Sequence, residues 1–316
     1  MNLQVAHTLR GSAERVDAVG VLLRDLIDYA GLFPPASLAM AAAGANYRAY
    51  SQSESSWLLG RFIVPVARLG EFEEAFVELP ISERSASGAN LRLSVLLGSD
   101  ALADVARIRQ FNAQMTNASS SPKAAIEAVE VKAANADEVA WLSGIVPAEL
   151  TTYFEVPLDN RSECIAAVAE CRRRAKIRTG GETADKFPTP ESVVEFIRLC
   201  ADRDVPFKAT AGLHHPLRSV HRFTYEPASP SGIMHGFINV FLAAAFLRAG
   251  IDRKLAVQVL EEQSSQAFHF DADGVCWRQH RLSRHEIAAT RQNFAISFGS
   301  CSFTEPIDDL RSLHLL

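Results

Sequence analysis

A short apolar run, a turn and then a helical pattern recur along this chain, eight times in all. The runs are rich in β-branched residues, which is typical of buried strands. The predicted strands are, in chain order, Asp25–Tyr29, Arg61–Val66, Leu91–Leu97, Ala128–Lys132, Tyr153–Pro157, Ala175–Arg178, Pro206–Thr210 and Ala295–Phe298. Strands that alternate with helices form a parallel sheet, and eight such units predict an α/β protein with a closed (β/α)8 TIM barrel.

The segments between the strands support this layout. Helical periodicity is clearest at Ala101–Asn112, Ala136–Leu142, Arg161–Arg174 and Pro190–Arg203, and Thr189 is a suitable cap for the last of these helices. The stretch Ala113–Lys123, rich in Ser and Asn, is expected to be an exposed loop. An open doubly wound sheet is the competing layout, but no Gly-x-Gly-x-x-Gly motif follows an early strand.

The interval between the seventh and eighth predicted strands is far longer than one helix requires. We therefore expect one domain over residues 1–316, with a helical and hairpin insertion at about 217–290. Its expected parts are a linker at Pro227–Gly232, helices at Met234–Leu247 and Arg253–Gln263, and a hairpin whose turn is Asp-Ala-Asp-Gly at 271–274. The sequence does not decide whether this insertion is a lid, an oligomer contact or extra packing.

Composition narrows the class of partner. Hydrophobic residues make up 48% of the chain and charged residues 22%, and the net charge of −5 comes without a basic cluster, which argues against nucleic acid. No apolar run reaches membrane-spanning length, and the N-terminus shows no secretion signal. The five cysteines form no Cys-x-x-Cys pair. We predict a cytoplasmic protein that acts on a small molecule, with homo-oligomer formation left open.

Two lysines carry the strongest functional signal. Lys176 and Lys208 lie in consecutive predicted strands, and each strand runs into a glycine turn. Burying a lysine is costly because its ammonium group must lose water, and repulsion between two neighbouring lysines favours the neutral amine on one of them. A neutral lysine can attack a carbonyl carbon. The pair therefore predicts Schiff-base chemistry.

The ends of other strands add charged groups at the expected mouth of the barrel. Alternation along a strand places three pairs of side chains on common sides: Lys176 with Arg178, Glu130 with Lys132, and Tyr153 with Glu155. If these sides face inward, one lysine is a nucleophile, the other is its electrostatic neighbour, and Glu130 or Glu155 moves protons. The alternatives are salt-bridged interior layers, or a register shifted by one residue that turns these side chains toward the helices.

A glycine and serine turn, Gly299-Ser300-Cys301-Ser302, follows the eighth predicted strand. Backbone N–H groups and hydroxyls in such a turn suit an anion, and barrels often bind phosphate after strands seven and eight. Arg178 is a candidate for the same anion or for a substrate carboxylate.

The pair His214-His215 follows the Lys208 strand, and both are expected to contact substrate. An alternative is a divalent metal bound by these histidines with Glu130 and Glu155. Adjacent side chains point in different directions, however, and no firm ligand spacing supports that set. We expect neither a metal nor an organic cofactor.

Several short motifs resemble one enzyme family. Lys-Ile-Arg-Thr-Gly at 176–180 is similar to the Lys-Thr-Ser-Thr-Gly of deoxyribose-phosphate aldolases, and Phe-Lys-Ala-Thr-Ala-Gly-Leu at 207–213 is similar to their Phe-Lys-Pro-Ala-Gly-Gly-Val. Ile-Asp-Tyr-Ala-Gly-Leu-Phe-Pro at 27–34 resembles the first-strand motif Ile-Asp-His-Thr-x-Leu-x-Pro, and the terminal Phe-Gly-Ser-Cys-Ser resembles the Gly-x-Ser-Ser phosphate turn. The matches occur in the family's order.

This resemblance implies that Lys176 forms the Schiff base and that Lys208 is the neighbouring lysine. It also implies a site carboxylate at Asp28. The positions that it places near an anion are Gly180, Gly212, Ser300 and Ser302. Thr179, beside Gly180, is a further candidate for substrate or anion binding.

The chain also departs from the family pattern. Glu130, followed by Lys132, stands where the fourth strand of the family carries an aspartate, and Arg178 replaces a small hydroxyl residue. The leading hypothesis is a lysine-dependent aldolase or lyase for a small, anionic carbonyl compound, with the substrate left open. The alternatives are a metal-dependent lyase or isomerase and a barrel that binds a ligand without turnover.

Overall fold

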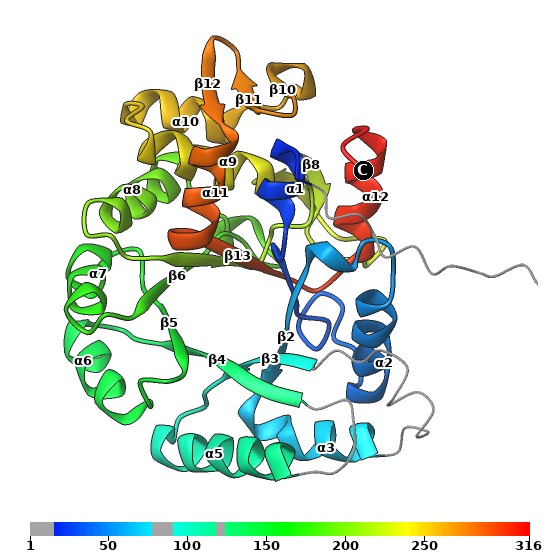
Figure 1. Ribbon diagram of the computed structural model, residues 1–316, viewed down its shortest axis with the longest axis vertical. Helices are drawn as coiled ribbons and strands as arrows, with labels where there is room; N and C mark the ends of the chain where they lie inside the picture. The colour runs from blue at the N-terminus through cyan, green and yellow to red at the C-terminus, as the bar shows by residue number, and fades with distance from the viewer. Residues whose placement is uncertain (1–15, 78–90, 118–123) are drawn as a thin grey trace, which may run out of the picture.

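Eight parallel strands form a closed barrel in the computed structural model, which describes residues 16–77, 91–117 and 124–316 (Figure 1). The strands of the barrel are β1 (Ile27–Tyr29), β2 (Leu59–Pro65), β3 (Leu91–Leu96), β4 (Ala124–Lys132), β5 (Thr151–Glu155), β6 (Arg174–Arg178), β7 (Phe207–Thr210) and β13 (Ala295–Ser300). β1 pairs with both β2 and β13, which closes the sheet. The predicted TIM barrel is confirmed.

Helices follow the strands and form the outer ring seen in Figure 1. They are α1 (Ala18–Leu23), α2 (Met40–Ser51), α3 (Leu69–Val77), α5 (Ala101–Asn117), α6 (Ala136–Ile145), α7 (Arg161–Glu170), α8 (Pro190–Ala201), α9 (Phe237–Arg248), α10 (Arg253–Glu261), α11 (Arg284–Asn293) and α12 (Thr304–Ser312). Thr189 caps α8 as predicted, because its side chain accepts a hydrogen bond from the Ser192 N–H group.

The stretch between β7 and β13 contains more than the expected parts. A hairpin of β8 (Ser219–Arg222) and β9 (Ser231–Met234) occupies the region of the expected linker, so the linker prediction was wrong for its last two residues. A second small sheet consists of β10 (Phe268–Phe270), β11 (Gly274–Trp277) and β12 (His280–Ser283), and the predicted turn at 271–274 lies between its first two strands. This sheet projects beyond the helical ring (Figure 1).

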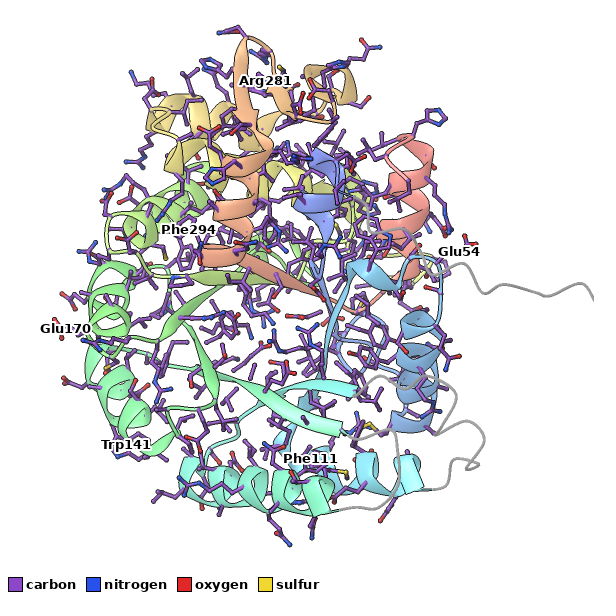
Figure 2. The ribbon with its side chains drawn as sticks, viewed as in Figure 1. Glu54, Phe111, Trp141, Glu170, Arg281 and Phe294 are labelled. Carbon is purple, nitrogen blue, oxygen red and sulfur yellow. The ribbon has the colours of Figure 1, made fainter. Side chains whose placement is uncertain are left out.

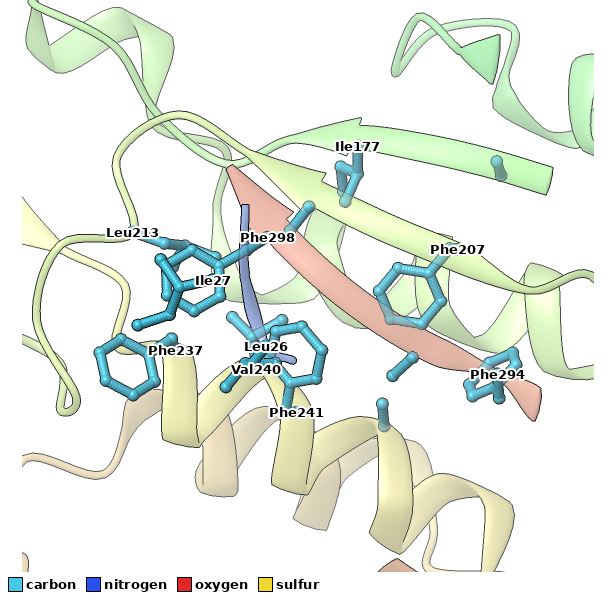
Figure 3. Packing of buried hydrophobic residues seen from close by; sticks show 14 of the residues in the cluster. Leu26, Ile27, Ile177, Phe207, Leu213, Phe237, Val240, Phe241, Phe294 and Phe298 are labelled. Atoms are coloured by element: carbon cyan, nitrogen blue, oxygen red, sulfur yellow. The ribbon is translucent and has the colours of Figure 1, made fainter. Parts of the chain in front are cut away.

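Helix α9 is the best-buried helix of this stretch, with buried residues from Phe237 to Phe246 without a break. It contacts β13, α8, α10 and α11. Phe237 and Phe241 pack against Phe298 of β13, as Figure 3 shows. A helix that is apolar on all sides must be covered on all sides, so α9 belongs to the layer that encloses the barrel.

Two further boundaries differ from expectation. The helix predicted to reach Arg174 ends at Glu170, because the chain turns at Arg172, where φ is +53°, and then enters β6. The expected loop Ala113–Lys123 is helical up to Asn117 in α5, and its remaining residues lie outside the described ranges.

Candidate active site

The interior of the barrel is filled with side chains from the strands (Figure 2), and several of the buried ones are polar or charged. The register of the sheet sets Lys176 on β6 beside Lys208 on β7 and beside Glu155 on β5. Side chains at paired positions of neighbouring parallel strands point to the same face. Inside the barrel, Lys176 contacts Glu155, and Lys208 contacts Glu130 of β4, so the predicted inward register is confirmed for them.

Glu130 of β4 joins the two lysines. Its Oε1 accepts a hydrogen bond from Lys208 Nζ at 2.6 Å, and its Oε2 lies 2.8 Å from Lys176 Nζ. The second contact is an ion pair without the angles of a hydrogen bond. Since both ammonium groups touch one carboxylate, they lie well within the ~10 Å over which charges act on each other at 0.1 M salt.

Each lysine has a second carboxylate partner. Lys208 donates to Asp28 Oδ2 at 2.6 Å, and Lys176 Nζ lies 2.9 Å from Glu155 Oε2. Asp28 in turn accepts from the Ser297 hydroxyl and from the backbone N–H of Arg61, both at 2.7 Å. The cluster therefore consists of two lysines and three carboxylates, and each lysine contacts two of the carboxylates, as burial of such groups requires.

The surroundings decide which groups stay ionised. Burial opposes charge on Glu130, but the neighbouring Lys176 and Lys208 outweigh it and hold the pKa of Glu130 well below its usual range. Burial also opposes charge on Lys208, and Asp28 and Glu130 outweigh it, so the pKa of Lys208 is raised above its usual value. Lys208 is therefore held in its charged form, and carboxylates contact both lysines of the pair.

The cluster opens into a cavity of about 720 Å³ at the carboxyl ends of the strands. Lys176, Glu130 and Glu155 lie in its wall, whereas the wall traced through the described residues does not include Lys208 or Asp28, which are almost fully buried. A bound molecule would thus meet Lys176 first, with Lys208 behind it. This volume suits a small molecule.

Three exposed basic side chains and one exposed acidic side chain, Glu182, line this cavity. The basic ones are Lys132, Arg178 and Lys186. Nearly half of the Arg178 side chain is exposed, and its Nε lies 3.4 Å from Glu155 Oε1. Burial opposes ionisation of Glu155, but Lys176 and Arg178 lower its pKa below the usual value. An anionic group entering here would find a free face of a guanidinium group that Glu155 already orients.

Only some of the residues predicted from the glycine and serine motifs line the cavity. Gly212 and Gly299 line the cavity, but within the described ranges Thr179, Gly180, Ser300 and Ser302 are not part of its wall. The Thr179 hydroxyl donates to the carbonyl of Ala211 at 2.7 Å and so joins the loops after β6 and β7. Ser302 Oγ accepts from the Glu305 N–H at the start of α12, so these groups have structural partners.

The two histidines lie on the side of α12. His214 lines the cavity and its Nδ1 is 3.1 Å from Glu305 Oε2, while His215 Nδ1 is 2.6 Å from Asp309 Oδ2. These two histidines therefore do not form a metal site with Glu130 and Glu155, which was the alternative prediction. Among the described residues, no group of three or more His, Cys, Asp or Glu side chains is arranged to hold a metal ion.

Sequence reasoning missed several polar partners. Ser94 donates to Glu130 Oε1 at 2.8 Å, Ser297 supports Asp28, and Lys208 Nζ lies 5.5 Å from the centre of the Tyr153 ring. Serines within apolar strands at inward positions are a signal that could have revealed the first two, because a buried hydroxyl needs a partner.

Fold and site together define a TIM-barrel protein with a buried cluster of two lysines and three carboxylates beneath a cavity whose wall also includes Lys132, Arg178 and Lys186. Neither the scan of protein-family models nor the search of curated proteins finds a match for this chain. Within the described ranges, no helix is both long and apolar enough to cross a membrane.

Proposed function

We propose that this protein is a lysine-dependent aldolase or lyase that binds a small, anionic carbonyl compound as a Schiff base on Lys176. One observation carries the proposal: a cavity-lining lysine lies beside a second, fully buried lysine, and Glu130 bridges them. Burying two lysines costs desolvation free energy, and a purely structural role would not require that cost.

In the proposed reaction, Nζ of a deprotonated Lys176 bonds to the carbonyl carbon. The carbonyl oxygen takes one proton from the attacking amine and a second from the carboxyl group that had accepted the lysine proton, so it leaves as water and an iminium ion remains. Glu155 is the carboxylate best placed to take the proton of Lys176, since it contacts Nζ at 2.9 Å and also faces the cavity. Glu130 is more deeply buried and holds Lys208, so its main task is to position the charges.

Trapping the iminium ion tests this function. The protein is incubated with acetone, acetaldehyde, pyruvate or dihydroxyacetone phosphate, reduced with borohydride and mapped by mass spectrometry. We expect a stable adduct on Lys176, its loss in Lys176→Arg, and its retention in Lys254→Arg, which changes an exposed lysine of α10. An unmodified Lys176 across the whole panel would refute the proposal.

The anionic character of the substrate needs its own test. Arg178→Gln should raise the pyruvate concentration for half-maximal labelling about tenfold, because a charged hydrogen bond contributes about 1.5 kcal/mol or more. Labelling by neutral acetone should change little. Arg198→Gln, on the outer face of α8, is the matched control. An equal effect of Arg178→Gln on both probes would exclude Arg178 as the anion contact.

A further inference from the structure

A second titratable group lies in the wall of the same cavity, outside the lysine cluster. His214 follows β7, is 9% exposed as a residue and lines the cavity together with Lys176. Its Nδ1 contacts Glu305 Oε2 at 3.1 Å. A cavity histidine with a carboxylate behind it has the arrangement of an oriented acid or base.

Glu305 is itself held in place. It lies in the first turn of α12, where its N–H donates to Ser302 Oγ at 3.1 Å, and the Tyr225 hydroxyl donates to its Oε2 at 3.3 Å. Burial opposes charge on Glu305, but His214 and Tyr225 outweigh it and lower its pKa. A carboxylate near a helix N-terminus is also favoured by the helix dipole. Glu305 is therefore an ionised, fixed acceptor.

An ionised acceptor at Nδ1 selects one state of the imidazole ring. Nδ1 carries the proton that it donates to Glu305, so in the neutral ring Nε2 has the lone pair. The carboxylate also stabilises the imidazolium ion that forms when Nε2 takes up a proton. His214 thus has the two states that proton transfer requires.

The neighbouring histidine is arranged differently. The His215 ring stacks on His221 at 3.3 Å between centres, and His215 Nδ1 contacts Asp309. Within the described ranges, neither His215 nor His221 is part of the cavity wall. Of these three histidines, His214 is the one that lines the cavity.

We propose that His214, oriented by Glu305, is the acid and base that moves the hydroxyl proton when the carbon–carbon bond breaks or forms. This inference rests on the proposed Schiff base at Lys176. It concerns the proton of the substrate hydroxyl group, whereas Glu155 contacts Lys176 and is assigned the proton of that lysine. His214 is a catalytic residue in this scheme and Glu305 a positioning residue.

The step balances without a further reactant. In cleavage, Nε2 takes the proton of the hydroxyl group, that oxygen forms an aldehyde, the adjacent carbon–carbon bond breaks, and its electron pair moves into the iminium ion to give an enamine. In the reverse direction the enamine carbon attacks an aldehyde, and the imidazolium ion of His214 returns the proton to the aldehyde oxygen.

The test separates this step from Schiff-base formation. The probe that labels Lys176 is placed in D2O with and without glycolaldehyde as acceptor, and three quantities are measured: borohydride adduct, deuterium exchange beside the carbonyl, and condensation product. His214→Asn keeps a side-chain amide near Glu305 but removes Nε2. His285→Asn changes an exposed histidine of α11 and is the control.

We expect His214→Asn to slow condensation about 100-fold or more, in the range of general acid–base catalysis. Its adduct yield and deuterium exchange should stay within about twofold of the unmodified protein. Condensation at the original rate would overturn the inference, as would a parallel loss of all three signals or a protein that forms the adduct but no product with glycolaldehyde. If no adduct forms on Lys176, the proposed function fails, and this inference fails with it.

Glu305 is tested by its pH profile. The groups around His214 are Glu305, His215, His221, Asp309, Tyr225 and Cys301. Glu305→Gln should move the half-maximal pH of condensation to lower values, because the imidazolium ion loses its anionic partner, and Glu305→Asp should restore part of the shift. A uniform loss of rate at every pH would show a purely structural role and contradict the positioning of His214.

Discussion

At the scale of single residues, Glu130 is the side chain on which the others depend. It is 1% exposed, yet it contacts Lys176, Lys208 and Ser94. Removing one member of a buried charge cluster leaves the others without compensation, which costs more than the contact itself contributes. The stability of the barrel interior should therefore respond strongly to this one carboxylate.

Glu130→Gln should lower the free energy of unfolding by about 3 kcal/mol at pH 7. The folded-state pKa of Glu130 is lowered, so its contribution is present above the unfolded pKa of about 4.3 and is lost as pH falls toward the folded value. The difference between the two proteins should accordingly shrink between pH 5 and pH 3, as urea unfolding at several pH values would show.

Glu71→Gln is the control for that measurement, because Glu71 pairs with Arg68 on the surface of α3 and such pairs contribute little. A Glu130→Gln protein that differs from the unmodified protein by the same amount at every pH would show that the charge of Glu130 is not what stabilises the cluster.

The residues of this cluster could largely be predicted from the sequence. Lys176, Lys208, Glu130 and Glu155 lie in short strands of alternating pattern that the barrel brings together. Asp28 was expected from the resemblance of its first-strand motif. Glu305 could not be predicted as a partner of His214, because that contact joins a loop after β7 to a helix after β13. Such a contact depends on where α12 lies, and no local pattern encodes that.

At the scale of elements, the loops after β6 and β7 meet at two glycines. A Cβ atom on Gly212 would lie 2.7 Å from the Gly180 Cα, and one on Gly180 would lie 2.5 Å from the Phe187 ring. Gly212 also has a φ of +72°, which favours glycine. These glycines are thus required for close approach of the backbones, whatever else they contact.

Gly212→Ala should destabilise the protein by about 2 kcal/mol or more, since it adds left-handed strain to a clash with backbone atoms. Gly144→Ala is the matched control: Gly144 lies in α6 with open space around its Cα, so alanine should raise stability by about 0.5–1 kcal/mol. Thermal unfolding of both variants measures the effect. Equal unfolding temperatures would mean that the loops can separate at little cost.

Element prediction succeeded where periodicity was strong and failed where it changed within a few residues. The eight barrel strands were found because each is a short apolar run before a turn. The β8–β9 hairpin was missed because Pro227–Gly232 has the composition of a linker, and the strands around it are largely exposed. Hydrophobic pattern identifies strands only when one face is buried.

At the scale of the whole molecule, the barrel closes between β1 and β13, which are far apart in the sequence. Arg291 of α11 supports this seam. Its guanidinium group is almost fully buried and donates to the carbonyls of Leu22 and Arg24 beside α1 and to those of Ala295 and Ile296 in β13. One side chain thus connects the segment before the first strand to the last strand.

Arg291→Met should therefore loosen the seam. Methionine would fill much of the space, but four carbonyl groups, two of them buried and two partly buried, would lose this donor. Each loss costs about 1 kcal/mol, so the net change should be a loss of about 3 kcal/mol. Hydrogen exchange should rise at amides of α1 and β13 before it rises in α6, since α6 lies away from the seam (Figure 1).

Two further variants make that prediction specific. Arg291→Lys keeps the charge but cannot reach four carbonyls with one ammonium group, so it should recover only part of the lost stability. Arg281→Gln breaks an exposed ion pair with Asp271 in the outer sheet and should leave hydrogen exchange at the seam unchanged. If Arg291→Met raises exchange evenly over all strands, the barrel opens as one cooperative unit. Closure at β1 and β13 would then depend on the hydrophobic contacts of α9 with β13 rather than on Arg291.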